Sequence, residues 1–193
     1  MKSSVSKEKF RLSSNVIDGI LWSLVKTLDL KCMVIFEKEK PYLARFYLHD
    51  SNEEVSIYLH YFFRSDDENF MHNHPWEKSF SIILTGGYTE EWFHENETTP
   101  FIKKAEHLPG EMNMVSPEKF HRVHLKGINC WTLFVGFKKL DGWCFWDKIN
   151  KKYDYWLHRN NKVKEKSIEV MTARDFRIDE YKNDALLEQR KNK

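Results

Sequence analysis

The stretch from Val55 to Phe137 carries the pattern that decides the fold. It contains five short runs rich in aromatic and β-branched residues: VSIYLHYFF (55–63), SFSIIL (79–84), GYTEEWF (87–93), HRVHL (121–125) and WTLFVGF (131–137). Turn residues such as Gly86-Gly87 and Pro109-Gly110 separate them. Short strands cut by turns at this spacing are typical of an all-β sandwich or barrel. Similar runs on both sides extend the predicted β domain to residues 33–156.

The segments on either side differ from this pattern. Residues 1–32 contain apolar residues at helical spacing, which predicts an amphipathic helix: Ile17, Ile20, Leu21, Leu24, Val25 and Leu28. Residues 157–193 are rich in charge of both signs, which predicts a solvated C-terminal extension. A cut after Lys162 is therefore expected to lower the melting temperature by only a few degrees, the effect of about 1 kcal/mol or less.

Composition excludes several classes of function. The chain has 193 residues, 41% of them hydrophobic, and 31 Lys and Arg against 29 Asp and Glu give a net charge of +2. This balance argues against nucleic-acid binding, and the apolar runs are too short to span a membrane. The N-terminus has no apolar signal region, and three widely spaced cysteines fit a reducing compartment. These features predict a cytoplasmic protein.

The sharpest local feature is His72-Asn73-His74-Pro75-Trp76. Residues two apart on an extended chain project to the same face, so both imidazoles can reach one metal ion. A third ligand must come from another strand, and His121 is the best candidate. His124, three residues later, is expected to point to the opposite face.

The order of these motifs resembles the cupin superfamily. A His-x-His pair, a glycine turn, a Pro-Gly turn and a later histidine follow one another, and HNHPW and GGYTEEW are similar to motifs of small cupin-like proteins of bacteria and phages. The resemblance implies a double-stranded β-helix, a jelly-roll barrel, in which His72, His74 and His121 hold a divalent metal ion such as Fe, Zn, Mn or Ni. The glutamate that usually joins them is replaced by Ser79. Three neutral ligands with open positions suit zinc or non-haem iron.

Two strands offer further candidate site residues. Tyr58, His60 and Arg64 share one face of the strand before the His pair and are the predicted substrate contacts, with Arg64 suited to a carboxylate or phosphate. Tyr88 and Glu90 follow the glycine turn and share a face, so they are predicted as catalytic acid–base groups. Glu90 is also a candidate to replace the missing glutamate.

Two functions stay open at this point. The first is a metal-dependent cupin enzyme, dioxygenase-like or a lyase or isomerase, acting on a small polar metabolite inside the barrel. The second is a non-catalytic cupin that binds a small ligand or a protein partner, and the lost glutamate motivates it. The predicted partner is a small molecule, with no nucleic acid and no membrane, and a homodimer is also open.

Overall fold

A computed structural model describes residues 12–37, 40–51, 54–67, 69–95, 101–140, 142–155 and 166–177. Residues 1–11 of the predicted N-terminal segment and residues 157–165 and 178–193 of the predicted C-terminal extension lie outside these residues. The elements in chain order are α1 (Ser14–Thr27), β1 (Lys31–Glu37), β2 (Lys40–Asp50), β3 (Val55–Phe62), β4 (Phe70–His72), β5 (Trp76–Thr85), β6 (Tyr88–His94), β7 (Lys103–His107), β8 (Met112–Val115), β9 (Lys119–Leu125), β10 (Cys130–Lys139), β11 (Cys144–Asp147), β12 (Lys152–Tyr155) and β13 (Lys166–Thr172).

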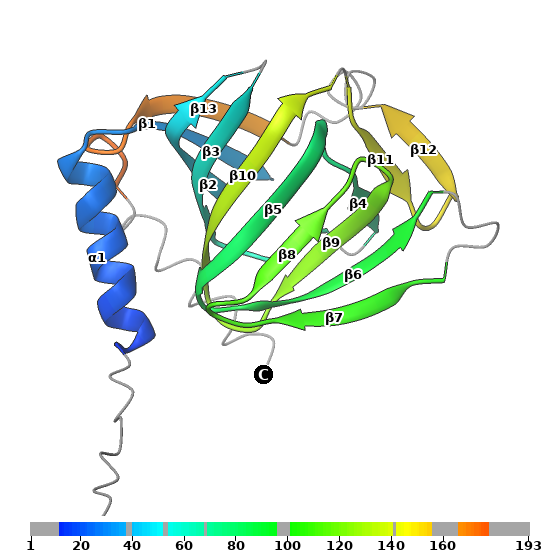
Figure 1. Ribbon diagram of the computed structural model, residues 1–193, viewed down its shortest axis with the longest axis horizontal. Helices are drawn as coiled ribbons and strands as arrows, with labels where there is room; N and C mark the ends of the chain where they lie inside the picture. Colours follow the sequence, from blue (N-terminus) through cyan, green and yellow to red (C-terminus); the bar gives the residue numbers. More distant parts are fainter. Residues whose placement is uncertain are drawn as a thin grey trace, which may run out of the picture.

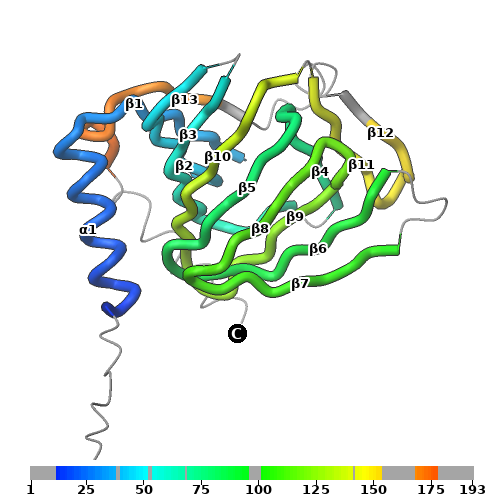
Figure 2. The backbone as a smooth tube through the Cα atoms, viewed as in Figure 1, coloured from blue at the N-terminus to red at the C-terminus, as the bar shows by residue number. Residues whose placement is uncertain are grey.

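The strands form two antiparallel sheets that face each other (Figure 1). The seven-stranded sheet has the order β13-β1-β2-β3-β10-β5-β8, and the six-stranded sheet has the order β12-β11-β4-β9-β6-β7. The tube in Figure 2 follows the chain from one sheet to the other several times. This is the double-sheet arrangement of a jelly roll, so the expected all-β, jelly-roll fold is confirmed.

The strand β3 separates two interiors because its side chains alternate. Leu59 and Tyr61 face α1 and pack in a cluster with Trp22 and Trp131. Tyr58 faces the opposite side of the sheet, where it packs with Trp76 of β5 and Phe134 of β10. The seven-stranded sheet therefore has a helix-covered side and a side that lines the space between the sheets.

The predicted N-terminal helix is present, but its buried face differs from the expected one. Trp22 and Val25 are buried, whereas Ile20, Leu24 and Leu28 are 52%, 42% and 54% exposed. The Trp22 ring contacts four aromatic rings of the core, and this large side chain determines which side of the helix faces the sheet. Among the described residues, no helix is long and apolar enough to cross a membrane.

The described part of the predicted C-terminal extension, residues 166–177, is largely exposed but is attached to the fold by a strand and a buried ring. The strand β13 pairs antiparallel with β1 over seven residues, from Lys31↔Thr172 to Glu37↔Lys166. Phe176 is 1% exposed and packs against Trp22 and Phe63. A cut after Lys162 would remove this strand and a buried aromatic ring, so a loss of more than about 3 kcal/mol is expected. The high charge of the segment concealed its few core residues.

Candidate metal centre

Three imidazoles converge between the two sheets. His72 ends β4 and lies directly opposite His121 of β9, while His74 lies in the connection between β4 and β5 rather than on the strand itself. One nitrogen of each ring lies within 4.8 Å of the other two. The Nε2 atoms of His74 and His121 are 2.8 Å apart. The predicted convergence of the three histidines is therefore present.

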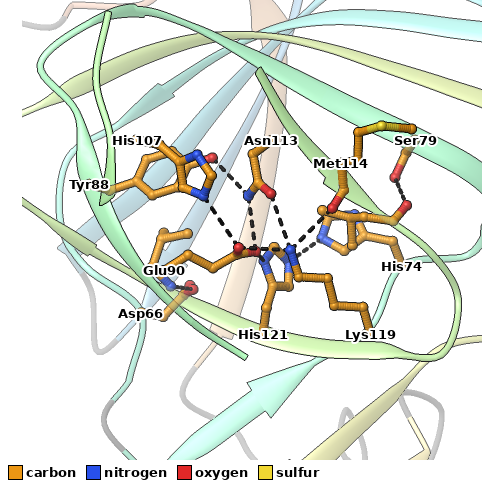
Figure 3. A network of polar contacts seen from close by, with 12 residues as sticks. Asp66, His74, Ser79, Tyr88, Glu90, His107, Asn113, Met114, Lys119 and His121 are labelled. Carbon is orange, nitrogen blue, oxygen red and sulfur yellow. Dashed lines mark hydrogen bonds and ion pairs between the residues drawn. The ribbon is translucent and has the colours of Figure 1, made fainter. Parts of the chain in front are cut away.

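The carboxylate of Glu90 fixes the orientation of the His121 ring (Figure 3). The Glu90 Oε1 atom lies 2.7 Å from His121 Nδ1. A carboxylate accepts hydrogen bonds, so Nδ1 carries the proton and Nε2 presents its lone pair to the other imidazoles. Histidines that bind metals commonly donate their second N–H in this way.

Glu90 is the centre of a buried polar network. The side chain is 1% exposed, and Lys119 Nζ donates to Oε2 at 2.7 Å. Asn113 Nδ2 donates to Oε1 at 2.9 Å and to the Tyr88 hydroxyl at 3.1 Å. Burial raises the pKa of Glu90, but the hydrogen bond to His121 and the charge of Lys119 outweigh it and hold the pKa well below its usual range. Glu90 is thus a permanent anion near neutral pH.

Tyr88 and Glu90, the predicted catalytic acid–base groups, lie close to the histidines. Both side chains lie between the sheets on the same face of β6, as predicted. Burial raises the pKa of Tyr88, and its hydroxyl accepts a hydrogen bond from Asn113. A carboxylate with a strongly lowered pKa is a weak base and a poor proton donor. The geometry therefore fits a role for Glu90 in orienting the His121 ring better than a role in proton transfer. Catalysis by Tyr88 and Glu90 stays a prediction.

The chemistry of the three histidines suits a divalent cation. Burial, followed by the neighbouring His121 and His72, holds the pKa of His74 well below its ordinary value. Neutral imidazole is the form that binds metals. In the described part of the chain, no carboxylate joins this group of three. Ser79 is buried, and its hydroxyl donates to the Val115 carbonyl at 2.9 Å, so residue 79 supplies no acidic ligand.

The predicted substrate contacts are only partly near the histidines. The Phe134 ring lies between His60 and the group of three histidines, because its centroid is 5.4 Å from that of His60 and 5.7 Å from that of His74. The polar atoms have internal partners: Arg45 Nε donates to His60 Nε2 at 3.0 Å, and the Tyr58 hydroxyl donates to Asp50. Arg64 is half-buried in the bend after β3. Substrate contact by these three residues stays a prediction.

Sequence reasoning missed residues that hold the site together. Asn73 Nδ2 donates to the Pro117 carbonyl at 2.9 Å, and the Cys144 backbone N–H donates to Asn73 Oδ1 at 2.7 Å. Asn73 therefore ties the connection that carries His74 to the turn before β9 and to β11. The only signal in the sequence was its position between the two histidines. Lys119 and Asn113 had no such signal.

The Trp76 ring packs beside the histidines because a glycine leaves room for it. The ring centroid of Trp76 lies 6.0 Å from that of His74 and 4.8 Å from that of Phe134. A Cβ atom on Gly136 of β10 would lie 2.5 Å from the Trp76 ring. Any larger residue at position 136 would therefore displace this wall of the site.

A cavity of about 310 Å³ lies beside the polar network. Its lining includes Ser79, Trp92, His94, Val115 and Lys119. Lys119 connects it to the histidines, because its ammonium contacts Glu90, which in turn contacts His121. The volume is at the lower end of the range for small-molecule sites.

Comparisons with known proteins concern the fold. No family model matches the sequence, and no curated protein matches it. Similar solved structures include the hydroxypropylphosphonic acid epoxidase from S. wedmorenis, with a TM-score of 0.42 and 14% identity over 54% of this chain and 55% of that one. KdgF from Halomonas sp. has a TM-score of 0.39 and 14% identity over 51% and 81% of the two chains. A cupin superfamily protein from Desulfitobacterium hafniense has a TM-score of 0.38 and 19% identity over 53% and 81%. The chain thus matches little more than half the length of the epoxidase.

Proposed function

We propose that this protein is a metal-dependent cupin enzyme that acts on a small polar metabolite between its two sheets. The observation that carries the proposal is the hydrogen bond between His121 Nδ1 and Glu90 Oε1, 2.7 Å long. It leaves the Nε2 lone pair of His121 directed at His74 and His72. An imidazole that only stabilised the fold would not need its second nitrogen turned toward two other imidazoles.

The three histidines would hold a divalent ion, which would supply a Lewis acid or a redox centre. Three neutral ligands leave coordination positions for water or a substrate. The nearby rings of Trp76, Phe134 and Phe145 would exclude bulk water from that side. The cavity lined by Lys119, His94 and Trp92 is large enough for a small metabolite. Oxygenase and lyase or isomerase chemistry are both compatible with such a site.

Metal analysis tests the first half of the proposal. We expect the purified protein to contain close to one equivalent of iron, zinc, manganese or nickel. A His72→Ala, His74→Ala double variant should lose it. The matched control is His49→Ala with His124→Ala, which removes two histidines outside the group of three and should retain the metal. Metal in the double variant at the level of the control would overturn the proposed centre.

Oxygen uptake separates the two reaction classes. The apoprotein is loaded with Fe(II) without oxygen, mixed with pools of small polar metabolites, and then exposed to oxygen. Uptake that depends on both a metabolite and His121 supports an oxygenase. Metabolite turnover by the zinc form without oxygen uptake supports a lyase or isomerase.

Ser79 favours the second candidate, a non-catalytic cupin. Its hydroxyl is committed to the Val115 carbonyl, where the cupin resemblance leads one to expect a glutamate ligand. Absence of metal from the wild-type protein, even after incubation with each ion, would favour this alternative. Ligand screening by thermal shift would then be the next measurement.

A further inference from the structure

Arg45 lies on the face of the seven-stranded sheet that lines the space between the sheets. Its neighbours on β2, Ala44 and Phe46, pack in the cluster that includes α1, and side chains alternate along a strand, so Arg45 points to the opposite side. It pairs with His60 in the register of β2 and β3, and its Nε donates to His60 Nε2 at 3.0 Å. The guanidinium carbon lies 4.9 Å from the centroid of the Tyr58 ring. These two contacts hold the guanidinium in one orientation.

The terminal nitrogens of Arg45 have no anionic partner. Within the described ranges, no carboxylate forms an ion pair with this side chain. Asp50, on the same strand, instead accepts hydrogen bonds from Tyr58 and Ser56. Arg45 is half-buried, and its terminal nitrogens stay open to solvent. A partly buried charge is unfavourable unless it is paired, so the position of Arg45 suits an anion that is not part of the chain.

Two side chains beside Arg45 also keep hydrogen-bond donors without an acceptor. His60 is 5% exposed, and burial, followed by the charge of Arg45, holds its pKa well below its ordinary value. The ring is therefore neutral near pH 7, and Nδ1 carries the proton because Nε2 accepts from Arg45. Thr132 pairs with His60 in the register of β10 and β3, and its buried hydroxyl has no hydrogen-bond partner. Three adjacent strands thus offer donors for which the described residues supply no acceptor.

One aromatic ring separates these donors from the three histidines. The Phe134 centroid lies 5.4 Å from that of His60 and 5.7 Å from that of His74, and the ring planes are inclined by 25° and 26°. The guanidinium is also close enough to His74 for its charge to be among the causes that lower the pKa of that imidazole. A molecule long enough to span this one ring would contact Arg45 with one end and a metal ion on the histidines with the other.

We propose that Arg45 binds the carboxylate of an elongated metabolite whose second polar end coordinates the metal ion. The inference rests on the proposed metal-dependent function and names the class of its substrate. A guanidinium presents parallel N–H donors that match the two oxygens of a carboxylate. One unpaired cation balances one carboxylate, whereas a phosphate monoester carries about two negative charges near neutral pH. Arg45 therefore determines specificity for an acid.

Binding of dicarboxylic acids tests the proposal without a known reaction. Malonate, succinate, glutarate and adipate differ only in the distance between their two carboxylates, and isothermal titration calorimetry measures their affinity for the zinc-loaded protein. One length should bind best, because both ends must reach their partners at once. Absence of binding by every acid in the series would overturn the proposal. Tighter binding of inorganic phosphate than of any of these acids would also overturn it.

Variants of Arg45 make two measurements move apart. Arg45→Met should weaken binding of the best acid at least about tenfold, because the charged hydrogen bonds are lost. Metal affinity should stay equal or rise, because the variant removes a positive charge near a divalent ion. Arg45→Lys keeps the charge but not the paired donors, so its affinity for the acid should be intermediate. The matched control is Lys104→Met, which removes one positive charge from a side chain that is 66% exposed and should bind the acid like wild type.

Three results would contradict this role of Arg45. Equal affinity of wild type and Arg45→Met for the acid is the first. The second is weaker binding of both acid and metal in Arg45→Met and Arg45→Lys alike, which a structural role would produce. The third is loss of acid binding in Lys78→Met in place of Arg45→Met, which would locate the anion in the cavity that Lys78 lines.

The metal-free protein separates this proposal from the proposed function. Acid binding that weakens without zinc, and weakens further in Arg45→Met, supports both. Acid binding that depends on Arg45 in a protein that takes up no metal would support the anion site and overturn the metal-dependent function. Stoichiometric metal together with acid binding independent of Arg45 would overturn the anion site alone.

Discussion

Glu90 and Glu91 are neighbours on β6, but they lie on opposite faces of the six-stranded sheet. Both are nearly buried, at 1% and 8% exposed, and both pair with cations from β9. Glu90 contacts Lys119 and His121 between the sheets. Glu91 contacts Arg122 on the outer face. The alternation of side chains along a strand gives two adjacent glutamates separate networks.

The two networks differ in what the carboxylate is connected to. Glu91 also contacts Lys104 at 2.7 Å and His124 at 3.6 Å, so its partners lead to the protein surface. Glu90 instead connects through His121 to the other two histidines. The two carboxylates are therefore similarly buried and similarly paired with cations. Only the contact with the three histidines distinguishes Glu90, the candidate functional carboxylate, from Glu91, the structural one.

The largest expected difference between the networks concerns the histidines. His121→Ala should abolish stoichiometric metal binding, because it removes one of the three proposed ligands. His124→Ala should retain the metal, because this ring lies on the outer face beside Glu91. Metal analysis after purification in parallel measures both. The reverse result would mean that the inward face of β9 has been assigned incorrectly.

The next effect concerns the stability of the outer network. Arg122→Met removes both nitrogen contacts of a buried guanidinium with Glu91 but leaves the exposed Lys104 in place, so the free energy of unfolding should fall by about 1.5–3 kcal/mol. Metal content should not change. Lys104→Met is the matched control, since Lys104 is 66% exposed and such pairs contribute about 1 kcal/mol or less. Urea unfolding measures both variants, and equal losses would contradict the difference in burial.

A smaller effect is expected on metal affinity. Glu90→Gln keeps the size of the side chain but weakens the hydrogen bond to His121 Nδ1, so metal affinity should fall about 10- to 100-fold. Glu91→Gln, the adjacent and chemically identical change, should leave the affinity within about twofold of wild type. Competition with a metal chelator measures both. Equal affinities would show that Glu90 does not orient the ligand.

Most strands between residues 33 and 147 were predictable because they depend on local periodicity, and the histidines were predictable from their spacing and their order along the chain. Alternation predicted the two faces of β3, and the His-x-His spacing with the later His121 predicted the group of three. His74 lies just beyond β4 rather than in it, but the extended connection preserves the geometry. The turn at Gly86-Gly87 was also predicted, and a Cβ atom on Gly86 would lie 2.3 Å from the Asn129 carbonyl oxygen.

The remaining features depend on contacts between distant residues. The pairing of β13 with β1 joins residues more than 100 positions apart, and nothing in the charged C-terminal sequence indicates it. The buried face of α1 is determined by where Trp22 fits among the aromatic residues of the sheet. The partners of Glu90 come from β8 and β9, so its surroundings could not be inferred from the residues beside it in the sequence.

The smallest expected effect is the acid dependence of stability. Burial raises the pKa of Glu91, but hydrogen bonds and charges from Lys104 and Arg122 outweigh it and lower the pKa from 4.5 to about 2. A pKa lower in the folded state than in the unfolded state stabilises the fold above the unfolded value. This contribution is fully present above about pH 4.5 and is lost as the pH falls toward 2. Glu90 acts in the same direction.

Urea unfolding of the metal-free protein between pH 6 and pH 2.5 measures this contribution for Glu91. The buried His60 and His74 also have lowered pKa values, so protonation at these residues destabilises the fold in acid for wild type and variant alike. The difference between wild type and Glu91→Gln removes that shared effect. We expect this difference to shrink below pH 4.5, by less than about 3 kcal/mol in total. If the difference in the free energy of unfolding stays constant over the whole pH range, Glu91 stabilises the fold through packing rather than through its charge. Glu90 and Glu91 would then share a buried position but not an electrostatic role.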